Sequence, residues 1–150
     1  MHLSSELTGS AAASVAAHLR VEVDGAFADV LDYTGQIKLL LDLPVFDRAK
    51  LITVRLRLAQ LRLVHGAVVN RVYRYLVANS DPAELEELET MRLGRQRLLQ
   101  QAAAHAAEWT LATIADNWPK YQYNTRIIVR RWLDLMNAER RLLDRRLTPA

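Results

Sequence analysis

The sequence predicts an all-α protein, an up-down-up-down antiparallel four-helix bundle with long helices, on three observations. Long stretches place apolar residues three and four positions apart, the spacing of one buried helical face. Three short breaks rich in proline and capping residues separate these stretches. Connections this short oblige each helix to run antiparallel to its predecessor. With 150 residues and no cysteine, we expect one domain over 1–150 that buries its core without disulfides, frayed at 1–10 and 147–150.

The first half of the chain contains the first two expected helices. The first begins at Ala11, because Gly9 interrupts the pattern before it, and it ends before Pro44, since the residue before a proline is pushed out of the helical region. The second helix follows Asp47, a favoured type of N-cap, and runs to about Ala78. Its apolar face consists of Leu51, Val54, Leu58, Leu61, Val68, Val72 and Tyr75.

The second half contains the other two expected helices. Asp81 and Pro82 predict the start of the third, because aspartate caps a helix and proline fits the first helical position. We expect this helix to continue to about Ala115. The break at 116–119 then precedes a fourth helix over 120–146.

The composition is that of an ordinary globular protein, with 51% hydrophobic and 25% charged residues and a net charge of +3. No apolar run approaches the roughly 20 residues that a membrane span needs, and the N-terminus lacks the basic region of a signal peptide. We therefore expect a cytoplasmic protein with no membrane contact. Because His18, His65 and His105 project to different heights, we expect no metal site, and no cofactor motif is present.

Three polar residues fall near the centres of apolar faces on three different helices. They are His65 on the second, Arg95 on the third and Glu139 on the fourth. Counting about 1.5 Å per residue from each break puts all three at one height, with Glu22 of the first helix at a similar level. The sequence therefore predicts a buried polar layer in which Arg95 pairs with Glu139 and His65 bonds the remaining carboxylate oxygen.

This predicted layer has two interpretations, and the third alternative is that one of the residues extends to solvent and no layer forms. A buried polar group can set the register of a helical bundle, which makes the layer structural. Alternatively, Arg95 and His65, with Glu139 and Glu22, bind an anionic small molecule between the helices, as in a sensor or an enzyme. We favour the structural interpretation, and the sequence leaves enzymatic activity open.

The second helix also has a second apolar strip outside its core face. Its residues are Ile52, Leu56, Ala59, Leu63 and Val77. Arg55, Arg62 and Tyr73 separate this strip from the core face. One helix of a monomeric bundle needs only one apolar face, so the extra strip predicts an interface, with a homodimer as the commonest outcome.

Arginine pairs at 130–131, 140–141 and 145–146 make the last helix basic. Such a helix can bind nucleic acid, but these arginines spread around the helix among Asp134, Glu139 and Asp144, which favours a solvated face with ion pairs. The sequence therefore predicts a non-enzymatic interaction or regulatory protein that forms a homodimer and could bind another protein. An anionic-ligand-binding bundle is the first alternative, and a nucleic-acid-associated protein is the second.

Overall fold

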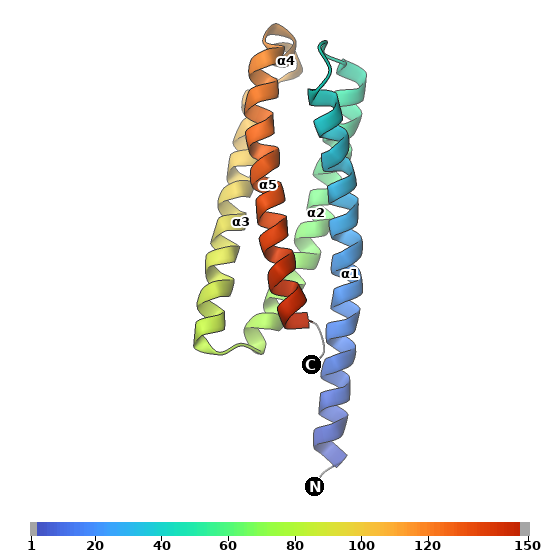
Figure 1. Ribbon diagram of the computed structural model, residues 1–150, viewed down its shortest axis with the longest axis vertical. Helices are drawn as coiled ribbons and strands as arrows, with labels where there is room; N and C mark the ends of the chain where they lie inside the picture. Colours follow the sequence, from blue (N-terminus) through green and yellow to red (C-terminus); the bar gives the residue numbers. More distant parts are fainter. Residues whose placement is uncertain (1–2, 148–150) are drawn as a thin grey trace.

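A computed structural model describes residues 3–147, with side chains described for residues 11–147. This part of the chain is all-helical and contains no strand. Its five helices are α1 (Leu3–Leu41), α2 (Arg48–Ala78), α3 (Pro82–Glu108), α4 (Leu111–Asp116) and α5 (Trp118–Leu147). In Figure 1 the four long helices lie side by side, and the short α4 covers one end.

The N-terminal prediction is corrected, because α1 begins at Leu3 rather than at Ala11. Gly9 lies within this helix, where a glycine costs about 1 kcal/mol relative to alanine without necessarily ending the helix. Figure 1 shows that this end of α1 extends beyond the other helices. At the other terminus α5 continues to Leu147, and the predicted fraying of 148–150 falls outside the described residues.

The predicted third helix is also corrected, because it is two helices. α3 ends at Glu108, and Thr110 starts α4 by accepting a hydrogen bond from the backbone N–H of Thr113 at 3.3 Å. The predicted starts of α2 and α3 agree with the structure, whereas α5 begins at Trp118, two residues before the predicted start at 120. Asp47 accepts a hydrogen bond from the N–H of Lys50 at 3.1 Å, and Asp81 caps α3 in the same way. A capping threonine thus divides a stretch whose apolar spacing alone appeared continuous.

The core runs along the axis between the four long helices. Its largest fully buried side chains include Phe27 of α1, Leu51 and Leu76 of α2, Leu88 of α3 and Tyr121 of α5. The packing is uneven, since α1 and α2 contact each other extensively whereas α2 and α3 barely touch.

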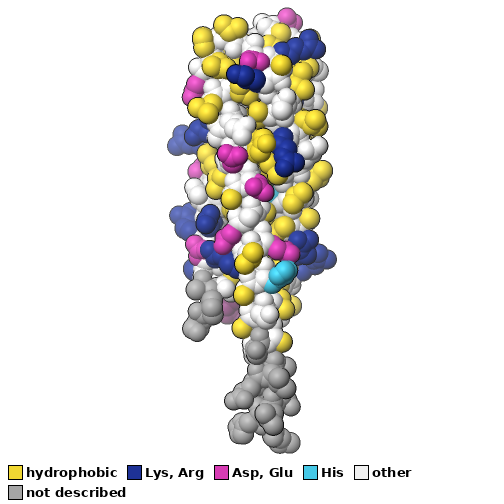
Figure 2. Space-filling view, turned by 90° about the vertical axis from the view of Figure 1, so that its right-hand side faces the viewer, with side chains coloured by type: hydrophobic (Ala, Val, Ile, Leu, Met, Phe, Trp, Pro, Cys, Tyr) yellow, Lys and Arg dark blue, Asp and Glu magenta, His cyan; other side chains and the backbone are white. Residues whose placement is uncertain are grey.

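Figure 2 shows the side of the molecule on which α1 and α2 lie. Basic and acidic side chains alternate there with hydrophobic ones, without segregating to one end. Within residues 3–147, no helix has the length and apolar character that crossing a membrane requires.

Candidate functional site

The polar side chains predicted from three helices meet in the core. Arg95 Nη1 donates to Glu139 Oε1 at 2.8 Å, and Arg95 Nη2 donates to Nδ1 of His65 at 2.9 Å. All three residues are buried, with exposed fractions of 4% for Arg95, 2% for Glu139 and 0% for His65. The predicted pairing of Arg95 with Glu139, in one buried layer with His65, is confirmed.

Two details of the predicted layer are wrong. The second carboxylate oxygen of Glu139 accepts its hydrogen bond from the Tyr73 hydroxyl at 3.3 Å, whereas His65 bonds the guanidinium. Glu22 does not belong to the layer. It lies near the surface, where it pairs with Arg71 at 2.8 Å and with His18 at 3.2 Å.

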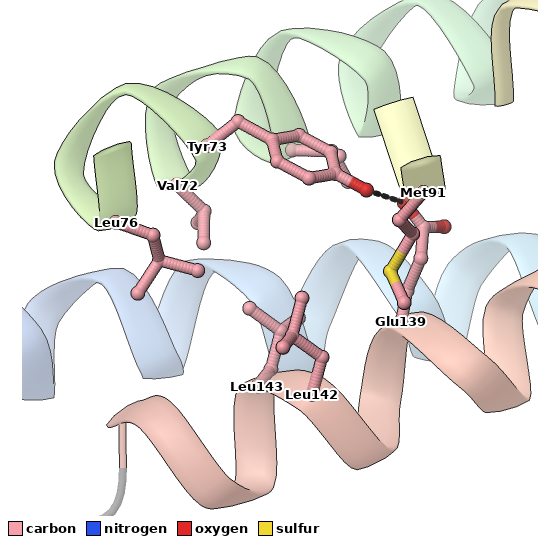
Figure 3. Close-up of a pocket in the computed structure, with 8 residues that line it drawn as sticks. Val72, Tyr73, Leu76, Met91, Glu139, Leu142 and Leu143 are labelled. Atoms are coloured by element: carbon pink, nitrogen blue, oxygen red, sulfur yellow. Dashed lines mark hydrogen bonds between the residues drawn. The ribbon is translucent and has the colours of Figure 1, made fainter. Parts of the chain in front are cut away.

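Tyr73 is the residue of the layer that sequence analysis missed. It was expected to separate two strips of α2, yet it is only 8% exposed. Its ring reaches from the flank of α2 toward Glu139 (Figure 3), and burial raises the pKa of its hydroxyl, which therefore stays protonated and donates. A phenol two turns beyond His65, on the flank of the buried face, was the available signal.

The protonation state of His65 follows from its partner. A guanidinium only donates hydrogen bonds, so Nδ1 must accept and the ring proton of the neutral histidine lies on Nε2. Burial, together with the charge of Arg95, lowers the pKa of His65 to about 3. Nε2 is buried without a hydrogen-bond partner, and the ring packs edge-on against Phe27 at a centroid distance of 4.6 Å.

The charges of the layer are balanced within it. Burial raises the pKa of Glu139, while Arg95 and the Tyr73 hydroxyl act in the opposite direction. Each carboxylate oxygen already has one donor, and the guanidinium also lies over the Trp132 ring, 5.5 Å from its centroid. Arg95 therefore has its compensating charge inside the core.

The space beside this layer is too small for a ligand. Glu139, Tyr73 and apolar side chains of α2, α3 and α5 line a cavity of about 10 Å³ (Figure 3). That volume suits at most a single water molecule, whereas small-molecule pockets span roughly 300–1,000 Å³. The geometry favours the structural interpretation of the layer.

The second apolar strip of α2 lies on the surface. The exposed fractions are 40% for Ile52, 61% for Leu56 and 78% for Leu63, and Ala59 is also exposed. No part of the chain that the structure describes covers this strip. Its predicted role as an interface stays a prediction.

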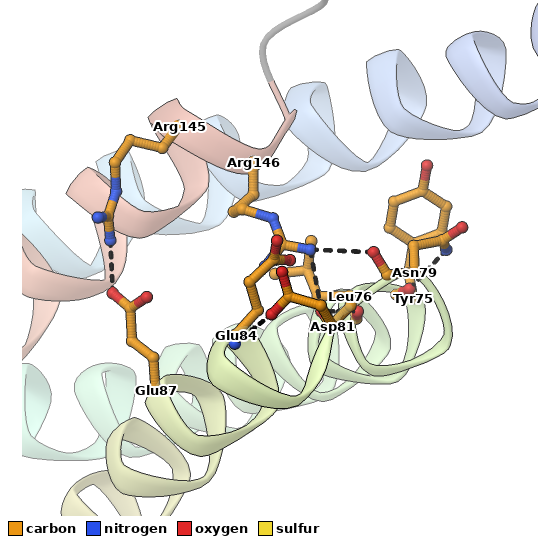
Figure 4. A network of polar contacts seen from close by, with 9 residues as sticks. Tyr75, Leu76, Asn79, Asp81, Glu84, Glu87, Arg145 and Arg146 are labelled. Carbon is orange, nitrogen blue, oxygen red and sulfur yellow. Dashed lines mark hydrogen bonds and ion pairs between the residues drawn. The ribbon is translucent and has the colours of Figure 1, made fainter.

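Several arginines of α5 form ion pairs with other helices. Arg145 contacts Glu87 at 2.5 Å, and Arg146 contacts Glu84 at 2.7 Å and the hydroxyl of Ser80 at 2.9 Å (Figure 4). These contacts join the C-terminal end of α5 to the start of α3. They agree with the expectation of a solvated face with ion pairs.

The comparisons add no family. No protein-family model, curated protein or solved structure matches this chain. Among the described residues, no group of three histidine or acidic side chains is arranged to hold a metal ion. The function of this chain is therefore inferred from its own geometry.

Proposed function

We propose that this protein is a non-enzymatic interaction module that pairs with a second copy of itself through the apolar strip of α2, defined by Ile52, Leu56, Ala59 and Leu63. The observation that carries the proposal is the exposure of Leu56 and Leu63, at 61% and 78%, on a helix whose opposite face is buried in the core. Exposed apolar side chains grouped along one helix are typical of an interface.

We infer further that the four long helices form an up-down-up-down antiparallel bundle. The order of contacts supports this topology. Arg20 of α1 pairs with Asp144 near the end of α5, whereas Asp42, just after α1, pairs with Arg126 near the start of α5. Residue numbers that rise along α1 thus meet numbers that fall along α5, as expected for antiparallel helices. Along α3 and α5, Glu87 pairs with Arg145 and Gln101 with Arg131, which again reverses the order.

A second copy suits the strip because the strip is uncharged and self-complementary. Between Ile52 and Leu63 its residues are apolar, and Ala59 in the middle is small enough to let another helix approach closely. In an antiparallel pairing about this centre, Leu63 of one copy lies near Ile52 of the other. Such an isologous contact buries the same strip on both copies.

The test is the mass of the particle in solution. Sedimentation equilibrium of the wild type should give a dimer at micromolar concentration, and Leu56→Glu with Leu63→Glu should give a folded monomer, because burying two charges in an apolar contact is unfavourable. The matched control is Val21→Glu with Leu39→Glu, two exposed apolar residues of α1 outside the strip, which should remain dimeric. A wild type that is monomeric at high micromolar concentration, or a control that dissociates equally, would refute the proposal.

A further inference from the structure

Arg62 of α2 lies in an open cleft, separate from the buried layer. This cleft, of about 320 Å³, lies where α2 and α3 diverge, and α1 and α5 also contribute to its walls. Its polar lining consists of Arg55 and Arg62 of α2, His105 of α3, and Tyr121 and Thr125 of α5. The volume falls at the lower end of the range of small-molecule sites.

Arg62 has no compensating charge in the described part of the chain. Its side chain is mostly buried, its Nε has no hydrogen-bond partner, and no carboxylate pairs with it. Its guanidinium lies over the Trp132 ring at 5.0 Å from the centroid. Burial lowers the pKa of Arg62 to about 10, which still leaves it charged at neutral pH. A buried cation without an anion is costly, so the position favours binding of an anion.

The other polar groups of the cleft do not supply that anion. Arg55 donates to the backbone carbonyl of Trp109 at 3.2 Å, at the C-terminal end of α3. His105 shares a hydrogen bond with Thr125 at 3.0 Å, and burial together with Arg55 lowers its pKa, so it is neutral at pH 7. The cleft lining thus contains two guanidinium groups and no carboxylate.

The rest of the lining determines what kind of group the ligand can carry beside its anion. It is apolar, consisting of Ile37, Leu56, Leu58, Ala59, Ala102, Ala106, Ile128 and Val129. A strongly hydrated ion such as phosphate gains nothing from such walls, whereas an apolar group attached to a carboxylate is removed from water there.

We propose that this cleft binds a small organic carboxylate, with the carboxylate on Arg62 and the apolar body against the surrounding aliphatic side chains. A guanidinium pairs with a carboxylate through two parallel hydrogen bonds, which suits a planar ligand group. The site is distinct from the buried layer, where Arg95 is already paired with Glu139. Leu56 and Ala59 belong to both the cleft and the α2 strip, so the variants used in the test leave the strip unchanged.

The experiment measures binding of two carboxylates and their neutral isosteres to the full chain. Benzoate and hexanoate are compared with benzamide and hexanamide by titration followed through backbone amide NMR shifts. At least one carboxylate should bind about tenfold more tightly than its amide, because a charge-assisted pair adds to the same apolar contact. The largest shifts should occur around Arg62, Ala102 and Val129.

Substitutions then test whether Arg62 makes the contact with the ligand carboxylate. Arg62→Met should weaken the carboxylate about tenfold and leave the amide unchanged, and Arg62→Lys should retain part of the preference. Arg74→Met, on an exposed arginine of the same helix away from the cleft, should change neither. Melting curves verify that each variant is folded.

Three results would overturn the proposal. The first is that neither carboxylate binds more tightly than its amide. The second is that a folded Arg62→Met variant keeps the preference, which would remove the assigned contact. The third is that inorganic phosphate binds more tightly than both carboxylates, which would contradict the role of the apolar walls.

Discussion

Two arginines lie against the same tryptophan, but only one of them has a carboxylate partner. The guanidinium groups of Arg62 and Arg95 both lie over the ring of Trp132, at 5.0 and 5.5 Å from its centroid. Arg95 has Glu139 as a partner within the core, whereas Arg62 has no carboxylate partner and lines an open cleft. One buried charge is therefore neutralised by the fold, and the other is left for an external anion or for water.

This difference separates a structural polar group from a candidate binding group. In the layer, the carboxylate has a donor on each oxygen and the adjacent cavity is only about 10 Å³. At the cleft, Arg62 has no carboxylate partner, and its side chain lines about 320 Å³ of open space. A satisfied group without adjacent space can position helices but cannot bind a ligand.

The largest expected effect comes from breaking the pair within the layer. Glu139→Ala leaves Arg95 buried without an anion and should cost about 3–5 kcal/mol of unfolding free energy, measured by urea denaturation. Arg95→Met with Glu139→Leu should recover most of that loss, because neither charge then remains. Glu89→Ala, which breaks the exposed pair with Arg92, is the control and should lose far less. A small loss for Glu139→Ala would mean that the layer does not contribute to stability.

The pH dependence of the unfolding free energy should reveal that His65 is neutral in the folded protein. His65 has a pKa of about 3 in the folded state, against 6.5 for an unperturbed histidine. Between these values the unfolded state binds more protons, so the contribution of His65 is complete above about pH 6.5 and falls by up to about 1.4 kcal/mol per pH unit as the pH drops toward 3.

The His65→Gln variant isolates this contribution. Glu139 has a raised pKa and contributes with the opposite sign over part of the same range, but it is present in both proteins. The difference between the two stability curves should therefore slope as His65 alone predicts. Parallel curves between pH 4 and 6.5 would show that His65 titrates normally.

The two arginines should respond to the same substitution with opposite signs. Arg62→Met removes a buried charge without an anion and should raise the unfolding free energy by about 1 kcal/mol, whereas Arg95→Met leaves Glu139 unpaired and should lower it. Urea denaturation of both single variants at neutral pH measures the contrast. Equal losses for both would mean that the charge of Arg62 is compensated as well as that of Arg95.

The smallest effect is expected from arginines on the surface of α5. Replacing Arg140, Arg141, Arg145 and Arg146 with glutamine should leave dimer formation intact, because these residues lie on α5 and not on the α2 strip. The Arg145–Glu87 pair is largely exposed to water and should contribute little to stability, whereas Arg146, 18% exposed, should account for most of any loss. Fluorescence anisotropy with labelled DNA and RNA at low and high salt tests whether α5 binds nucleic acid. A salt-dependent affinity in the wild type that this variant loses would assign the helix to nucleic acid.

The sequence by itself determined the helical class, most helix boundaries and the meeting of His65, Arg95 and Glu139. Helical periodicity gives the direction of a side chain about its own axis, and the rise per residue gives its height. It also indicated that the α2 strip would be left outside the core. The break at Thr110 was hidden, because a capping residue within a continuous apolar pattern gives only a weak signal.

Tertiary structure alone decided which flanking residues became buried. Glu22, Tyr73 and Arg62 all lie at the edges of apolar faces, yet Glu22 is near the surface, Tyr73 is buried in the layer and Arg62 lines a cleft. The burial of a flanking residue depends on the distance and rotation between neighbouring helices, which every side chain in the core sets jointly. Here α1 and α2 pack closely whereas α2 and α3 diverge, and that unequal spacing created the cleft beside Arg62.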